Sequence, residues 1–145
     1  MKFLIVTHVP HSIEQKRHFG YAPYVREMNI WLKHVDQCII VAPISNEKPN
    51  AITIAYQHPD IVFYKIPSIA LTSLKNIFKT TLALPIIIVT IRKAMQQADH
   101  IHLRCPGNIG LLACVVQIFF PNKSKTAKYA GNWDPKATQP WSYRL

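Results

Sequence analysis

The stretch KFLIVTH, residues 2–8, decides the fold of this chain. It is a short, unbroken apolar run rich in β-branched residues, which is typical of a strand buried on both faces of a sheet. The stretch QCIIVA at residues 37–42 repeats the pattern. Strands of this kind occur mostly in parallel sheets that helices cover on both sides, so the sequence predicts such a sheet.

Working outward, strand patterns alternate with helical ones. Residues 24–35 place apolar side chains at helical spacing behind Pro23, which a first helical turn tolerates. The other predicted elements are strands at residues 61–66, 99–103 and 125–130, and helices over residues 74–98 and 109–120. We expect Pro85 to kink the first of these helices or to break it in two. The charged residues 10–22 predict a long loop, and residues 52–56 alternate only weakly.

This order implies right-handed crossovers and a doubly wound sheet. The predicted fold class is α/β: a single Rossmann-like domain over residues 1–145, with a mainly parallel sheet and helices on both faces. The length agrees, because a domain takes about 100 to 200 residues. Ligands of such sheets bind beyond the carboxyl ends of the strands. The loops after residues 8 and 66, the turn at residues 104–108 and the tail after residue 130 are therefore the places for a site.

The sequence lacks the motifs of several classes of binding site. The loop after the first strand reads VTHVPHSIEQ, without the G-x-G-x-x-G of a dinucleotide site, and the chain has no GxxxxGK[ST] of a P-loop. The pairs His8/His11 and His100/His102 have no carboxylates or cysteines near them at ligand spacing, so we expect no metal. We expect His100 to pack between strand and helix.

The turn after the fourth predicted strand has the residues of an anion site. His102 and Arg104 are two apart and face alike, and Gly107 and Asn108 then open a helix whose amides and dipole favour an anion. With His8 at the end of the first strand, Arg104, Gly107 and Asn108 are expected to bind a phosphate or carboxylate. His102 is the candidate general base. The alternative is that Arg104 caps a helix and that His102 is a satisfied core residue.

The charge of the chain is concentrated in its second half. Residues 1–60 hold 6 Lys+Arg and 5 Asp+Glu, whereas residues 61–145 hold 11 Lys+Arg and 2 Asp+Glu. This asymmetry indicates an anionic partner, either a phosphate-bearing ligand, a nucleic acid or an acidic membrane surface. The alternative is that the charge serves solubility alone.

Two apolar runs, residues 82–91 and 109–120, are shorter than the roughly 18 to 20 residues that span a bilayer. We read them as buried or half-buried helices, or as helices on a membrane surface. Three cysteines without CxxC spacing and no signal peptide fit the cytoplasm.

The tail, residues 129–145, has no regular period but carries Trp133 and Trp141. These side chains would stack sugar rings or meet another domain. The alternative is that residues 131–145 are the cut end of a longer chain.

The order of elements and several motifs resemble the N-terminal half of a GT-B glycosyltransferase of the family 4 group. KFLIVTHVP at residues 2–10 is similar to the first strand of that group, and the segment from Gly20 to Glu27 is similar to its glycine-bearing loop and helix, without the second glycine. The family signature Asp-x-x-His-x-His resembles residues 99–104, in which Arg104 replaces the second His.

The resemblance implies an acceptor-binding domain, with Gly20 near the acceptor and Arg104 selecting a more anionic one. A second domain would bind the nucleotide-sugar donor, in cis or in trans, so this chain would bind no cofactor and would be inactive alone. The implied acceptor is a glycan or a polyprenyl-phosphate-linked lipid of the cell envelope, reached at the inner membrane face. The alternatives are an acceptor subunit of a two-chain enzyme and a basic nucleic-acid-binding module. The balanced charge of residues 1–60 and the missing RNA-binding signatures argue against nucleic acid.

Overall fold

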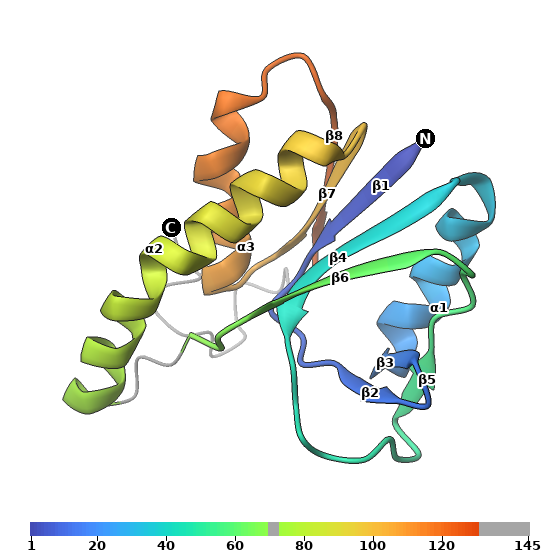
Figure 1. The fold of residues 1–145 in the computed structure, drawn as a ribbon, viewed down its shortest axis with the longest axis horizontal. Helices are drawn as coiled ribbons and strands as arrows, with labels where there is room; N and C mark the ends of the chain where they lie inside the picture. The colour runs from blue at the N-terminus through green and yellow to red at the C-terminus, as the bar shows by residue number, and fades with distance from the viewer. Residues whose placement is uncertain (70–72, 131–145) are drawn as a thin grey trace, which may run out of the picture.

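β1 (Lys2–Val6) is the central strand of a five-stranded sheet in a computed structural model that describes residues 1–69 and 73–130, with the backbone alone for residues 74 and 75. The sheet order is β6-β4-β1-β7-β8, and every neighbouring pair is parallel (Figure 1). Its other strands are β4 (Gln37–Pro43), β6 (Ile61–Ile66), β7 (His100–Cys105) and β8 (Ser124–Tyr129). The predicted α/β class with a parallel sheet is confirmed.

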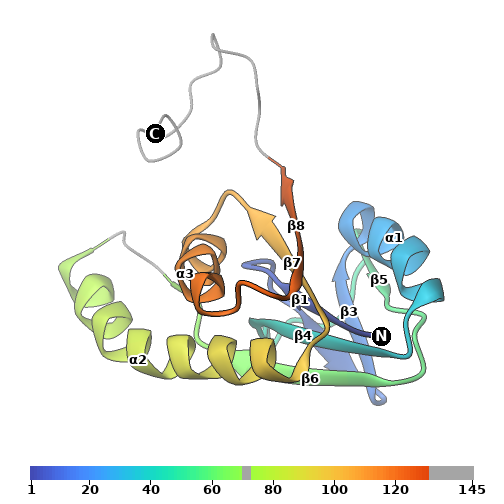
Figure 2. The same cartoon turned by 90° about the horizontal axis from the view of Figure 1, so that it is seen from above.

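Helices cover both faces of this sheet, as predicted (Figure 2). α2 (Leu74–Gln97) and α3 (Asn108–Val116) lie on one face, and α1 (Ala22–Trp31) lies on the other. Short 3-10 turns follow α1 at Leu32–His34 and α3 at Gln117–Phe119. Successive side chains of a strand point to opposite faces, so the apolar strands feed two cores.

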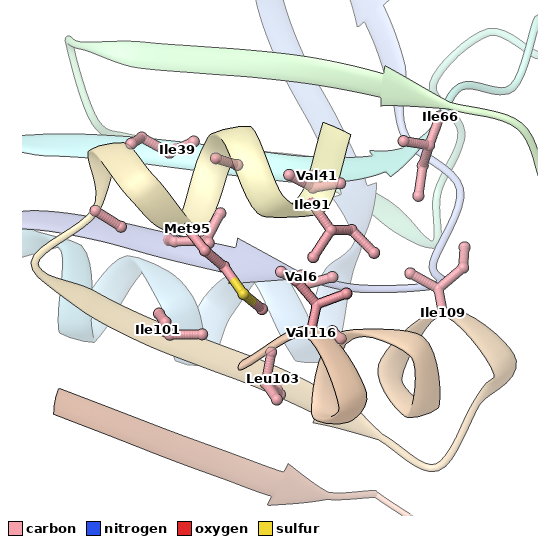
Figure 3. Packing of buried hydrophobic residues seen from close by; sticks show 14 of the residues in the cluster. Val6, Ile39, Val41, Ile66, Ile91, Met95, Ile101, Leu103, Ile109 and Val116 are labelled. Atoms are coloured by element: carbon pink, nitrogen blue, oxygen red, sulfur yellow. The ribbon is translucent and has the colours of Figure 1, made fainter. Parts of the chain in front are cut away.

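The larger core lies under α2 and α3. Figure 3 shows its side chains converging from both helices and from the strands: Val6, Ile39, Val41, Ile66, Ile91, Met95, Ile101, Leu103, Ile109 and Val116. The second core lies under α1, where Phe3 and Ile5 of β1 pack with Tyr24, Val25 and Met28. β1 therefore contributes alternate residues to both cores, which explains its unbroken apolar sequence.

The predicted loop over residues 10–22 is wrong. β2 (Ser12–Glu14) and β3 (Arg17–Tyr21) form a hairpin there, and β5 (Thr53–Ala55) pairs antiparallel with β3. Gln15 and Lys16, the two residues between the strands, both have positive φ, 48° and 63°, as in a two-residue hairpin turn. Such turns favour Asn and Gly, so a turn made of Gln and Lys gives no sequence signal for a hairpin. The two strands are partly exposed and show no apolar alternation either.

α2 is one continuous helix, so of the two outcomes expected at Pro85, a kink or a break, the break does not occur. The helix begins at Ser73, whose Oγ accepts a hydrogen bond from the backbone N–H of Asn76 at 3.3 Å. Thr80 before the proline and Ile87 after it are both buried. We attribute the continuity of the helix to this packing on both sides of Pro85. None of the described helices is long and apolar enough to cross a membrane.

Candidate functional site

The carboxyl edge of the parallel sheet holds most of the predicted site residues. The loop after β1 is held against the end of β4: the His11 N–H donates to the Pro43 carbonyl at 2.9 Å, and the Ser45 N–H donates to the His11 carbonyl at 2.8 Å. His8 therefore starts a well-positioned loop. The structure places it beside the turn that follows β7.

A cavity of about 230 Å³ opens at this edge, lined from four strand ends by His8, Pro43, Ser68, Ile69, Gly107, Asn108 and Ile109. Three predicted anion residues, His8, Gly107 and Asn108, are thus brought together. Gly107 precedes α3, and no side chain caps that helix end. A Cβ on Gly107 would lie 2.6 Å from His8 Nδ1, and its φ is 156°, so glycine is required here.

Arg104 is presented on the other face of the sheet. Leu103 and Cys105 of β7 face α3, so the alternating Arg104 faces α1, where its guanidinium carbon lies 4.1 Å from the centre of the Tyr24 ring. The predicted combination of the Arg104 side chain with the amides of α3 on one face is therefore not formed, because the register of β7 separates them. The two groups share only the carboxyl edge.

Several polar atoms of Arg104 and its neighbours are buried without a hydrogen-bond partner among the described residues. They are Nε and Nη1 of Arg104, the Tyr24 hydroxyl and His102 Nε2. Among those residues, no salt bridge involves Arg104; Lys128 pairs with Glu27 instead. A buried donor without a partner costs about 1–3 kcal/mol, so a group of them indicates a place for an acceptor atom.

The neighbours of Arg104 are held neutral. Burial, with smaller effects that include the Arg104 charge, lowers the pKa of His11 to about 4; burial, His100 and Arg104 do the same for His102. Burial raises the pKa of Tyr24 and of Tyr56, and Arg104 opposes that rise only in part. Burial and Arg104 also lower the pKa of His8. At neutral pH the guanidinium therefore adds positive charge to neutral surroundings, which favours an anion.

His11 and Tyr56 form a fixed pair beside Arg104. His11 Nδ1 lies 2.8 Å from the Val9 carbonyl, and a carbonyl can only accept, so Nδ1 carries the proton. Neutral His11 then accepts from the Tyr56 hydroxyl at Nε2, 3.0 Å away. Sequence reasoning missed the contact between His11 and Tyr56 and the place of Tyr24 beside Arg104. The patterns of residues 24–35 and 52–56 indicate secondary structure, and they do not indicate which side chains meet.

His102 lies in the core. It is 1% exposed, its ring stacks on Phe3, and its Nδ1 lies 2.8 Å from the Thr126 hydroxyl. The same hydroxyl lies 3.0 Å from Nε2 of half-buried His100, so both histidines face one side of the sheet, as predicted. This burial argues against the predicted role of His102 as a base that contacts a substrate directly, and it favours the packed alternative.

The remaining candidates fall into two groups. Gly20 lies on β3 and not in a loop, and a Cβ there would lie 3.1 Å from His11 Nε2. The His11 ring therefore lies against Gly20, where the resemblance places an acceptor. Trp133 and Trp141 lie outside the described residues. Among the described residues no group of three His, Cys, Asp or Glu could hold a metal ion.

Comparison with known proteins adds no function. No family model matches the chain, and no curated protein matches it. Among solved structures, the C-terminal domain (residues 78–226) of a hydrogenase from Pyrococcus furiosus is similar over 88% of this chain and 90% of that one, with a TM-score of 0.49 and 8% sequence identity.

Proposed function

We propose that this chain is the acceptor-binding N-terminal half of a nucleotide-sugar-dependent glycosyltransferase, and that its acceptor carries a phosphate or another anionic group. The observation that carries the proposal is half-buried Arg104, whose Nε and Nη1 are buried and unpaired among the described residues. An anionic acceptor that extends over the carboxyl edge to the α1 face would satisfy those donors. The kind of enzyme rests on the sequence resemblance.

Two parts of the carboxyl edge take part in binding. The cavity at His8, Gly107 and Asn108 supplies the uncapped start of α3, which favours negative charge. Arg104 supplies the fixed positive charge, and its effect on the pKa of His8 indicates that its field reaches this cavity. An anion held by the cavity would therefore also be stabilised by Arg104, across the edge that the two faces share.

The chain does not transfer sugar alone in this proposal. A donor-binding domain, in a longer form of the same chain or in a second chain, brings the nucleotide-sugar to the edge of the sheet. The acceptor is a glycan or a lipid-linked sugar, and the protein is cytoplasmic and peripheral at the inner membrane face. His102 and Thr126 position the strand that carries Arg104 and transfer no proton.

Isothermal titration tests the proposal with geranyl phosphate, with geraniol as the uncharged match, and with nucleotide-sugars. Geranyl phosphate should bind and geraniol should not. Arg104→Gln should weaken binding about tenfold or more, because charged hydrogen bonds contribute about 1.5–3 kcal/mol. Arg26→Gln, which removes an exposed arginine from α1, is the matched control. Equal binding by the Arg104 and Arg26 variants, or tight binding of a nucleotide-sugar by this chain alone, would overturn the proposal.

A further inference from the structure

α2 has two apolar faces. On one side, Ile87, Ile91 and Ala94 belong to the core between α2 and the sheet, and Thr80 is also buried. On the opposite side a second stripe points outward at the helical spacing i, i+4, i+11: Phe78 is 66% exposed, Leu82 66% and Val89 63%. Exposed Pro85 lies between them. A helix that is apolar all round is normally buried, so this outer stripe lacks a covering among the described residues.

α3 and the turn after it extend the same surface. Leu111 is 66% exposed, Val115 54%, Ile118 69% and Phe119 75%, again at helical spacing. α2 and α3 contact each other and lie over the same face of the sheet (Figures 1 and 2). We call these seven exposed residues, three on α2 and four on and after α3, the outer apolar face. Single exposed apolar residues are common, but a cluster of this size marks an interaction site.

The charges around the outer apolar face are all positive. α2 carries exposed Lys79, Arg92 and Lys93 and no acidic residue, and residues 108–120 carry no charge at all. Exposed Lys125 follows α3 in the chain, whereas the single acidic residue between residues 61 and 130 is Asp99. An apolar face that has a basic border, and no acidic group on it among the described residues, complements a surface that is apolar inside and negative at its rim.

We propose that the outer apolar face docks on an anionic lipid bilayer, with α2 and α3 lying in the plane of the headgroups. Phe78, Leu82 and Val89 enter the boundary between headgroups and acyl chains, and Lys79 and Arg92 contact lipid phosphates. α2 has 24 residues and is about 36 Å long, so the contact extends across much of one side of the molecule. The carboxyl edge lies outside this face, so the proposal holds whether or not the chain belongs to a glycosyltransferase.

Flotation of the full chain with vesicles tests this docking. Vesicles with about one third phosphatidylserine or phosphatidylglycerol should retain the protein, and pure phosphatidylcholine vesicles should retain much less. The variant F78S/L82S/V89S should lose binding by at least tenfold. The matched control is I13S/I30S/I52S, whose three isoleucines are 46%, 63% and 62% exposed outside this face. Circular dichroism establishes that both variants are folded.

A second pair of variants measures the contribution of charge to vesicle binding separately from that of apolar contact. K79Q/R92Q should weaken binding to anionic vesicles by roughly fivefold for each residue removed, as expected for about 1 kcal/mol per basic residue. K33Q/K48Q removes the same charge from exposed positions outside this face and should leave binding unchanged. Equal losses in both pairs would overturn the proposal. So would a dimer in light scattering that F78S/L82S/V89S dissociates while vesicles bind nothing, because the face would then be an interface between two copies.

Discussion

At the scale of single residues, the charge of Arg104 lies among groups that burial keeps neutral, His11, His102 and Tyr24. Arg104 ends a parallel strand at its carboxyl side, as the sequence predicts. Its face could not be predicted, because one residue of register moves a side chain from α3 to α1. Its partner Tyr24 is 80 positions away in the chain, so no local pattern indicates their contact.

The buried histidines make stability depend on pH. Burial lowers the pKa of His11 and His102 from 6.5 to about 4, so the unfolded chain binds more protons than the folded one between these values. The free energy of unfolding is therefore greatest above pH 6.5 and falls as the pH drops toward 4, by up to about 1.4 kcal/mol per pH unit for each histidine.

Urea unfolding between pH 7.5 and 4.5 measures this slope. His11→Gln should reduce the slope by up to about 1.4 kcal/mol per pH unit, because one of the two groups no longer titrates. His102→Gln should have a similar effect. If both variants kept the slope of the parent protein, the two histidines would not be buried in the neutral form.

Gly107 should tolerate no side chain. Gly107→Ala places a Cβ 2.6 Å from His8 Nδ1 at a φ of 156°, so we expect a loss of about 1–3 kcal/mol in the free energy of unfolding. His8→Ala in the same chain removes the collision but not the backbone strain. The double variant should therefore recover part of the loss in a urea titration; no recovery would show that His8 is not against Gly107.

At the scale of elements, continuous apolar runs were predicted well and short polar strands were not. β1, β4 and β6 are buried or half-buried runs, and the sequence predicts each of their bounds to within two residues. The hairpin of β2 and β3 is set by two residues with positive φ and by pairing with β5, more than thirty residues later. Tertiary pairing of that kind leaves no periodic signal in the sequence.

Pro85 gives a test of α2 as a single helix. Proline inside a helix removes one backbone hydrogen bond and crowds the preceding turn, at a cost of about 3 kcal/mol. Because Pro85 is exposed, and because Thr80 before it and Ile87 after it are buried, Pro85→Ala should raise the free energy of unfolding, by up to that amount. A decrease in thermal unfolding experiments would contradict a continuous α2, because it would indicate that the proline ends a helix there.

At the scale of the whole molecule, the two faces and the edge of the sheet have different properties. α1 and the small sheet enclose neutral histidines and tyrosines around Arg104, whereas α2 and α3 present the outer apolar face with its basic border. The sequence located the excess charge in residues 61–145. Among the described residues, the structure divides that charge between half-buried Arg104 at the carboxyl edge and lysines and arginines such as Lys79 and Arg92, which are exposed on α2.

The central claim is that the carboxyl edge binds an anionic acceptor. It is tested most directly by nuclear magnetic resonance of the ¹⁵N-labelled chain during titration with geranyl phosphate. We predict that the Arg104 Nε–H signal and the backbone amides of Gly107 and Asn108 shift together with one saturating curve. Unchanged signals at these three positions, at concentrations where geranyl phosphate shifts amides elsewhere, would contradict the account.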